Sequence, residues 1–297
     1  MRIIILLLSF FCACIILPCH GFAENTAGRY GKLSKPTEGM SINDLMKLSY
    51  HLKFTKDCKD YECWGEYNLV NKKDMVLNRE WHRYRTVLNR LSDGINYKDI
   101  LVIEKPQNIK GMAVLIWTYL DQARDDEMWL WLPSLRKVRR TSQLEDDDSV
   151  FGTDFNYEEM FSGRYESDTY RLIREDVFPG YTSSYSKQEY NKDVPCYLIE
   201  ATPTRKNWYY EKKHMYLDKK TACNIFEEYF DSEGVKMKTI SRFWSAFRDA
   251  PYLTEDFDES RDLRSGHYTP VDIKDVVFDK QLPENMFTER YLMRGKW

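Results

Sequence analysis

One short stretch of the sequence concentrates side chains that could bind a charged group. Four cations lie within residues 136–140, and the acids of residues 145–148 follow closely. A cationic rim of this kind binds a phosphate head group through charge-assisted hydrogen bonds. The same cations can instead pair with the neighbouring acids, although exposed ion pairs add little stability. Both interpretations stay open, and Arg136, Arg139 and Arg140 are the candidates for a cationic lip.

Large aromatic side chains surround this stretch, and they make up 15% of the whole chain. Residues 127–132 alternate so that Met128 and two leucines face one side while Trp129 and Trp131 face the other. A strand that is apolar on both faces must be covered twice, by the core and by a second layer or a ligand. The sequence does not say which face points inward. The candidates for the wall or lid of a hydrophobic cavity are Trp117, Tyr119, Trp129, Trp131, Phe151, Phe155, Tyr157 and Phe161.

The residue types that could catalyse a reaction or bind a metal do not have the spacing that either role requires in this sequence. Asp154 and the aspartates of residues 146–148 do not have the spacing of a calcium-binding loop. Glu158 and Glu159 would point apart as neighbours on a strand, so they do not form an acid and base pair. The sequence has no Gly-x-Ser-x-Gly elbow and no glycine-rich phosphate loop, and its histidines are scattered. We therefore expect no enzyme, no metal site and no cofactor.

The pattern predicts a mainly β scaffold for these residues. Ser41 and Asp44 form a capping box, and apolar residues at helical spacing predict an amphipathic helix over 42–54. Turn residues separate short runs rich in β-branched and aromatic side chains, with no strand-helix-strand rhythm, which favours a curved antiparallel sheet or incomplete β-barrel enclosing a few helices. The predicted strands are 80–88, 99–104, 113–119, 127–132, 135–140, 170–174, 194–202, 207–217, 222–230, 235–243 and 271–278.

The amino terminus has the features of a secretory signal peptide. Arg2 precedes an apolar run, and small residues follow at Gly21 and Ala23, so we expect cleavage after residue 23. An uncleaved anchor and a lipoprotein remain weaker alternatives. We expect residues 24–40 to be a flexible lead-in and residues 41–297 to form a single domain. The net charge of -3 gives no field that would collect nucleic acid.

Four cysteines remain after the expected cleavage, an even number in an oxidising compartment. A disulfide between Cys58 and Cys63 is favoured because the polar residues between them can turn. Buried free thiols are an equally good interpretation of Cys196 and Cys223.

Two motifs carry a family resemblance. Residues 131–140 read Trp-Leu-Pro-Ser-Leu-Arg-Lys-Val-Arg-Arg, and residues 148–160 read Asp-Ser-Val-Phe-Gly-Thr-Asp-Phe-Asn-Tyr-Glu-Glu-Met. They resemble the signature of the LolA-like outer membrane lipoprotein-sorting proteins, in which a Tyr-Leu-Pro strand leads to Lys/Arg-Val-Arg-Arg and then to Phe-x-Gly-Ser-Asp-Phe-x-Tyr-Glu-Asp. The chain departs conservatively from that pattern at Trp131, Thr153 and Glu159.

The resemblance covers residues 75–292 and leaves the region around Cys58 and Cys63 without a counterpart. It implies an incomplete β-barrel around a helical plug, with an apolar hollow that shelters the acyl chains of a lipid or lipoprotein in the periplasm. It also implies an inner-membrane transporter and an outer-membrane acceptor as partners. Shelter is needed because each exposed methylene costs about 0.8 kcal/mol in water. The alternative is a non-enzymatic periplasmic adaptor of a membrane exporter, which binds protein and fills the hollow with its own side chains.

Overall fold

The fold is described by a computed structural model over residues 36–37, 39–121, 123–141, 149–247 and 252–294. The expected signal peptide of residues 1–23, most of the lead-in and the acids of residues 145–148 lie outside the described residues. None of the helices in the described part of the chain has the length and apolar character needed to cross a bilayer.

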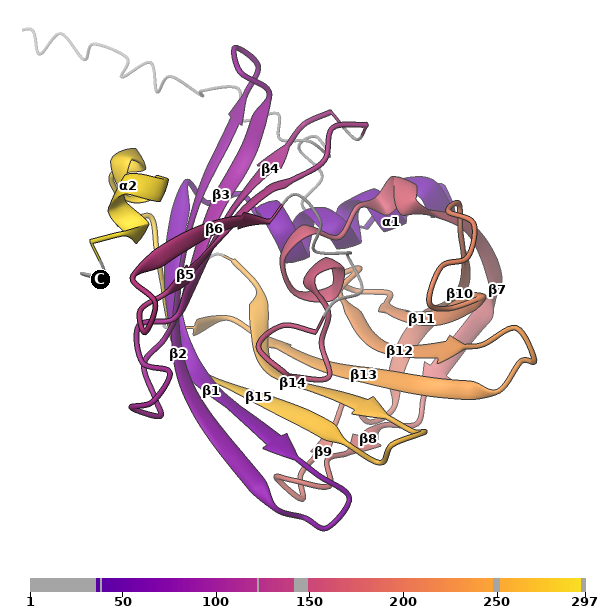
Figure 1. The fold of residues 1–297 in the computed structure, drawn as a ribbon. Helices are drawn as coiled ribbons and strands as arrows, with labels where there is room; N and C mark the ends of the chain where they lie inside the picture. The colour runs from indigo at the N-terminus through magenta and orange to yellow at the C-terminus, as the bar shows by residue number, and fades with distance from the viewer. Residues whose placement is uncertain (1–35, 38, 122, 142–148, 248–251, 295–297) are drawn as a thin grey trace, which may run out of the picture.

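A single curved sheet of thirteen antiparallel strands forms the body of the molecule (Figure 1). The sheet begins with β6 and ends with β7, in the order β6-β5-β4-β3-β2-β1-β15-β14-β13-β12-β11-β10-β7. This confirms the predicted curved antiparallel sheet. The bounds are β1 Asp60–Val70, β2 Val76–Arg90, β3 Ile95–Ile103, β4 Ala113–Tyr119, β5 Glu127–Leu132, β6 Lys137–Thr141, β7 Asp168–Phe178, β10 Val194–Pro203, β11 Lys212–Asp218, β12 Asn224–Phe230, β13 Lys236–Ser245, β14 Thr254–Asp262 and β15 Tyr268–Phe278, with β8 Tyr181–Thr182 and β9 Glu189–Tyr190 paired separately.

The longest described helical segment begins at the predicted cap. The Ser41 hydroxyl accepts a hydrogen bond from the Asp44 backbone N–H at 3.1 Å, and α1 spans Ile42–Tyr50 before a π-helical turn at His51–Thr55. Its buried stripe, which includes Met46 and Tyr50, packs against apolar side chains of β3, β10 and β11. The other described helical pieces are short: Glu158–Ser162, Tyr165–Ser167, Glu284–Met286 and α2 at Glu289–Leu292.

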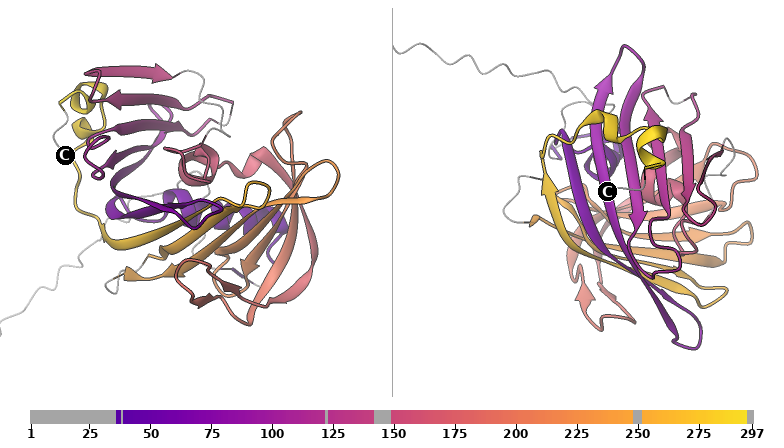
Figure 2. Two further views of the ribbon diagram at one scale, coloured as in Figure 1. Left: turned by 60° about the horizontal axis from the view of Figure 1, so that its bottom comes forward. Right: turned by 60° about the vertical axis from the view of Figure 1, so that its left-hand side comes forward.

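The sheet around β3–β5 is apolar on both faces, as residues 127–132 predict. On the concave face, Val114, Ile116 and Met128 belong to the main core with the segment after β6. On the convex face, Trp129 and Trp131 pack with the carboxy-terminal segment, whose α2 lies outside the sheet in both views of Figure 2. The odd-numbered face of β5 is therefore the convex one.

Several predicted boundaries differ from the structure. β4 and β5 have the predicted bounds, but β1 and β14 were not among the predicted strands. Residues 207–211 are not strand, and β11 begins at Lys212. The predicted strand over 135–140 begins only at Lys137 because the Arg136 N–H bonds back to the Pro133 carbonyl and closes a turn.

The predicted disulfide is not formed in the structure, since Cys58 and Cys63 are both free and buried, as are Cys196 and Cys223. β1 already begins at Asp60, so the residues before Cys63 are extended instead of turning back. The three strand steps from Asp60 to Cys63 cover about 10 Å and carry Cys63 away from the bend at residues 57–59.

Candidate functional site

The concave side of β3–β5 carries a continuous apolar wall. Leu101 and Ile103 of β3, Val114 and Ile116 of β4, and Met128 of β5 are all buried there, and we call these five residues the inner wall. Each lies on the inward-facing side of its strand, because side chains alternate between the two faces of a sheet.

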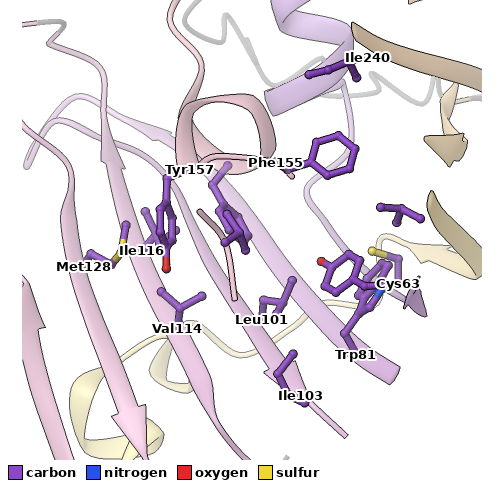
Figure 3. Packing of buried hydrophobic residues seen from close by; sticks show 14 of the residues in the cluster. Cys63, Trp81, Leu101, Ile103, Val114, Ile116, Met128, Phe155, Tyr157 and Ile240 are labelled. Atoms are coloured by element: carbon purple, nitrogen blue, oxygen red, sulfur yellow. The ribbon is translucent and has the colours of Figure 1, made fainter. Parts of the chain in front are cut away.

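Residues 149–163, here the inner segment, fill the space in front of this wall. Phe155, Tyr157 and Phe161 are buried in the same cluster as the inner wall, and Phe151 packs against it. Figure 3 shows the Tyr157 ring beside Ile116. Tyr157 therefore lies where a lid would cover the wall, whereas Phe155 points toward Ile240 of β13 (Figure 3).

The other aromatic candidates lie elsewhere. Trp117, Trp129 and Trp131 belong to the convex cluster, and the Trp117 indole N–H donates to the Phe287 carbonyl at 3.0 Å. Tyr119 lies at the end of β4, where its hydroxyl donates to Glu127 at 2.8 Å. Neither Trp129 nor Trp131 lines the concave wall, because the carboxy-terminal segment covers their face of the sheet.

The three arginines of the predicted cationic lip do not share one face. Arg140 is paired with Glu127 at 2.8 Å and lies opposite Trp129, on the convex side. Arg139 lies opposite Leu130, on the other side of β6, and Arg136 is in the turn before it. Arg136 lines a convex surface hollow together with Trp131.

Polar contacts tie the inner segment to the strands opposite the inner wall. The Asp154 carboxylate accepts a hydrogen bond from Thr269 of β15 at 2.7 Å, and its carbonyl accepts one from Ser260 of β14 at 2.8 Å. Further along, Glu159 pairs with Lys238 of β13 at 2.6 Å.

The helical turn of the inner segment has a reciprocal cap. The Asn156 N–H donates to the Glu159 carboxylate at 2.9 Å, and the Glu159 N–H donates to the Asn156 side chain at 2.8 Å. Glu158 and Glu159 are thus both buried in a helical turn, not on the strand we expected. The spacing Asn-x-x-Glu was the signal in the sequence that predicts such a turn.

A buried ionic triad forms the floor of the site. Arg83 binds Asp99 in a two-pronged contact at 3.0 and 2.7 Å, and the Arg85 Nε–H donates to the same carboxylate at 2.7 Å. Asp99 and Arg85 have side chains that are 1% and 0% exposed. Burial alone would raise the pKa of Asp99, but the two guanidinium groups outweigh it and hold that pKa below its usual value.

The triad also holds the end of the inner segment. Arg83 donates to the Met160 carbonyl and Arg85 to the Phe161 carbonyl, both at 3.2 Å. The Tyr97 hydroxyl donates to the Phe161 carbonyl at 2.6 Å. The carbonyls that end the helical turn are therefore satisfied by charged and polar side chains of β2 and β3. Sequence reasoning missed these residues because cations within a strand are typical of a solvent-facing side.

A small cavity lined by both charged and apolar side chains lies where α1, the inner segment and β11–β13 meet. Its lining includes Lys53, Lys213, Glu227, Tyr229 and Arg242. The space open to the centre of a water molecule is about 30 Å³, enough for about two waters. An acyl chain does not fit this cavity, so the concave side does not contain an open apolar hollow at these residues.

Ion pairs line this cavity. Glu227 lies 2.7 Å from Arg242, and the Tyr229 hydroxyl donates to Glu227 at 3.0 Å. Lys213 pairs with Asp168 at 2.9 Å. Burial opposes ionisation of Glu227, but Arg242 and Lys213 outweigh it and lower its pKa to about 2. The charges around this cavity are therefore paired with one another.

Comparisons with known proteins agree with this architecture. Residues 96–294 match a family model whose description reads "Uncharacterized protein". No curated protein matches the chain in sequence.

Three solved structures share the fold. A "putative outer membrane lipoprotein-sorting protein domain" from Vibrio parahaemolyticus is 22% identical, with a TM-score of 0.69, over 85% of this chain and 98% of its own. A DUF1329 family protein from Desulfovibrio piger is 20% identical, with a TM-score of 0.70, over 84% and 97%. A LolA superfamily protein from Nitrosomonas europaea is 14% identical, with a TM-score of 0.58, over 85% and 99%.

Proposed function

Because the chain belongs to the family whose model matches residues 96–294 and has the fold of the LolA-like lipoprotein-sorting domains, we propose that it is a non-enzymatic periplasmic carrier. Its cargo is the acyl chains of a lipid or lipoprotein, received from an inner-membrane transporter and passed to an outer-membrane acceptor. The acyl chains lie against the inner wall, in the space that the inner segment fills when no cargo is bound.

The observation that supports this proposal is the two-sided chemistry of the inner segment. Its polar anchors face β2, β3 and β13–β15, through residues such as Asp154 and Glu159. Toward β4 it presents the Tyr157 ring, which packs on apolar side chains (Figure 3). An acyl chain that takes the place of this ring restores apolar contact to the wall, and the anchors of Asp154 and Glu159 lie on the other side of the segment.

The filled space also favours a second function. Phe155, Tyr157 and Phe161 occupy the hollow as the adaptor hypothesis expects. An adaptor would keep the inner segment in place permanently and use its outer surface to bind a membrane protein. The two functions differ in whether the inner wall accepts an acyl chain.

Replacing Tyr157 by Ala separates the two functions. The substitution removes a buried ring and should destabilise the fold by about 3 kcal/mol. In a carrier it also removes a competitor for the wall, so the variant should bind an environment-sensitive fluorescent fatty acid more tightly than the wild type. Native mass spectrometry with lipid extraction should show endogenous lipid on the gently purified protein.

Trp129→Ala is the matched control. Trp129 is also a buried aromatic residue, but it lies on the convex face of the strands that carry the inner wall. The substitution should lower stability without changing the affinity for the probe. An adaptor predicts that neither the wild type nor Tyr157→Ala binds the probe or retains lipid, and that result would overturn the carrier proposal.

A further inference from the structure

The turn between β1 and β2 exposes an apolar cluster that has no part in the concave site. Residues 71–77, here the hairpin tip, contain three consecutive large apolar side chains: Met75, Val76 and Leu77 are 61%, 50% and 49% exposed. The hairpin extends beyond its neighbours at the bottom of Figure 1 and in the right-hand view of Figure 2. Consecutive exposed apolar residues at a strand end favour aggregation and usually mark a contact surface.

The hairpin tip is apolar on both faces. Met75 and Leu77 lie on one side of the extended chain and Val76 lies on the other, because side chains alternate along a strand. The turn itself is fixed, since the Asn71 side chain accepts hydrogen bonds from the Lys73 and Met75 N–H groups at 2.9 and 3.2 Å. A preformed tip loses little conformational freedom when it binds.

Two lysines precede the apolar cluster in the same turn, with Asp74 between them and Met75. Lys72 and Lys73 lie at the turn and are exposed. The β14–β15 turn lies beside it, because Gly266 is against Lys72, and it carries exposed Arg264.

The acids of the two turns are fewer than the cations. They are Asp74, which is exposed, and Asp262, which lies 3.8 Å from Arg264. Three cations and two acids give these two turns a net charge of +1, although the whole chain carries -3.

We propose that the hairpin tip docks on an anionic lipid bilayer. Met75, Val76 and Leu77 enter the acyl region, while Lys72 and Lys73 remain among the head-group phosphates. Exposed apolar side chains with two lysines in the same turn match the layered chemistry of a bilayer surface, where each lysine near anionic lipid adds to the binding. This inference does not depend on whether the concave site carries acyl chains.

Vesicle flotation tests the proposal with the purified protein. The wild type should float with vesicles that contain phosphatidylglycerol and should bind phosphatidylcholine vesicles more weakly. K72Q/K73Q should lower the partition coefficient by about thirtyfold, and M75S/V76S/L77S should lower it on the order of tenfold or more. All five positions are exposed, so circular dichroism should show an unchanged fold.

The matched control is L91S in the turn between β2 and β3, at the other end of the hairpin. Leu91 is 90% exposed, and its replacement should leave the binding unchanged. The proposal is overturned if the wild type does not float with anionic vesicles, if the tip variants bind as the wild type does, or if L91S loses as much binding as they do.

Discussion

Replacing Asp99 by Asn tests whether the ionic triad holds the site together. Asp99 accepts hydrogen bonds from both Arg83 and Arg85, and Arg85 in turn donates to the Phe161 carbonyl. An Asn side chain keeps the size of Asp but removes the negative charge. Two arginines, one of them fully buried, would then face each other without a counter-charge.

The expected cost follows from that uncompensated charge. Removing one partner of a buried ion pair destabilises a protein by about 3–5 kcal/mol. That loss is a large part of the 5–15 kcal/mol by which domains are typically stable. It corresponds to a decrease in Tm of about 10 °C for a chain of this size.

Urea unfolding followed by circular dichroism measures the cost at pH 7. Asp99→Asn should move the midpoint to lower urea without changing the slope of the transition. Glu189→Gln is the matched control, since Glu189 and Lys192 form an exposed pair at 3.0 Å that contributes at most about 1 kcal/mol. If the two variants lose the same stability, then the triad is effectively solvated and does not hold the inner segment.

Two further predictions concern ionisation. The folded pKa of Glu227 is about 2, below its ordinary value of 4.5, so its contribution to stability is present above pH 4.5 and is lost as the pH falls toward 2. Over that pH range the free energy of unfolding should decrease less for Glu227→Gln than for the wild type. Equal pH slopes for the two proteins would contradict the pairing of Glu227 with Arg242. Burial raises the pKa of the Cys58 and Cys63 thiols to about 12, so Ellman's reagent should react slowly with the native protein. In urea Cys58 and Cys63 should react along with Cys196 and Cys223, whereas two reactive thiols fewer, with Cys58 and Cys63 unlabelled, would show that these two are joined as a disulfide.

The strands that the sequence predicts well are those whose burial is visible locally. β4 and β5 are continuous apolar runs that end at turn residues, and their bounds agree with the structure. β1 also has a readable pattern, with Tyr61, Cys63 and Tyr67 buried on one side. The interpretation of Cys58 and Cys63 as a turned disulfide obscured that alternation.

The ionic residues of the concave face had no such local signal. β14 contains five acids in nine residues, which indicates a solvated loop when read alone. In the structure, Glu255 of β14 lies 3.6 Å from Lys53, which belongs to an element about two hundred residues earlier in the chain. The face of β5 that points inward was equally undetermined, because only the carboxy-terminal segment around Phe287 decides which side is covered.

The inner wall is covered by the inner segment, and this is compatible with a carrier if an acyl chain gains about as much free energy from binding the wall as the aromatic rings do. Burying an aromatic side chain contributes about 1.5–3 kcal/mol, so Phe155, Tyr157 and Phe161 together contribute roughly 5–9 kcal/mol. An acyl chain of about ten methylenes contributes roughly 8 kcal/mol at the same surface. The exchange is nearly balanced only if the anchors on β2, β3 and β13–β15 stay formed while the rings leave. The affinity of Tyr157→Ala for a fatty acid therefore distinguishes a displaceable lid from a permanent core.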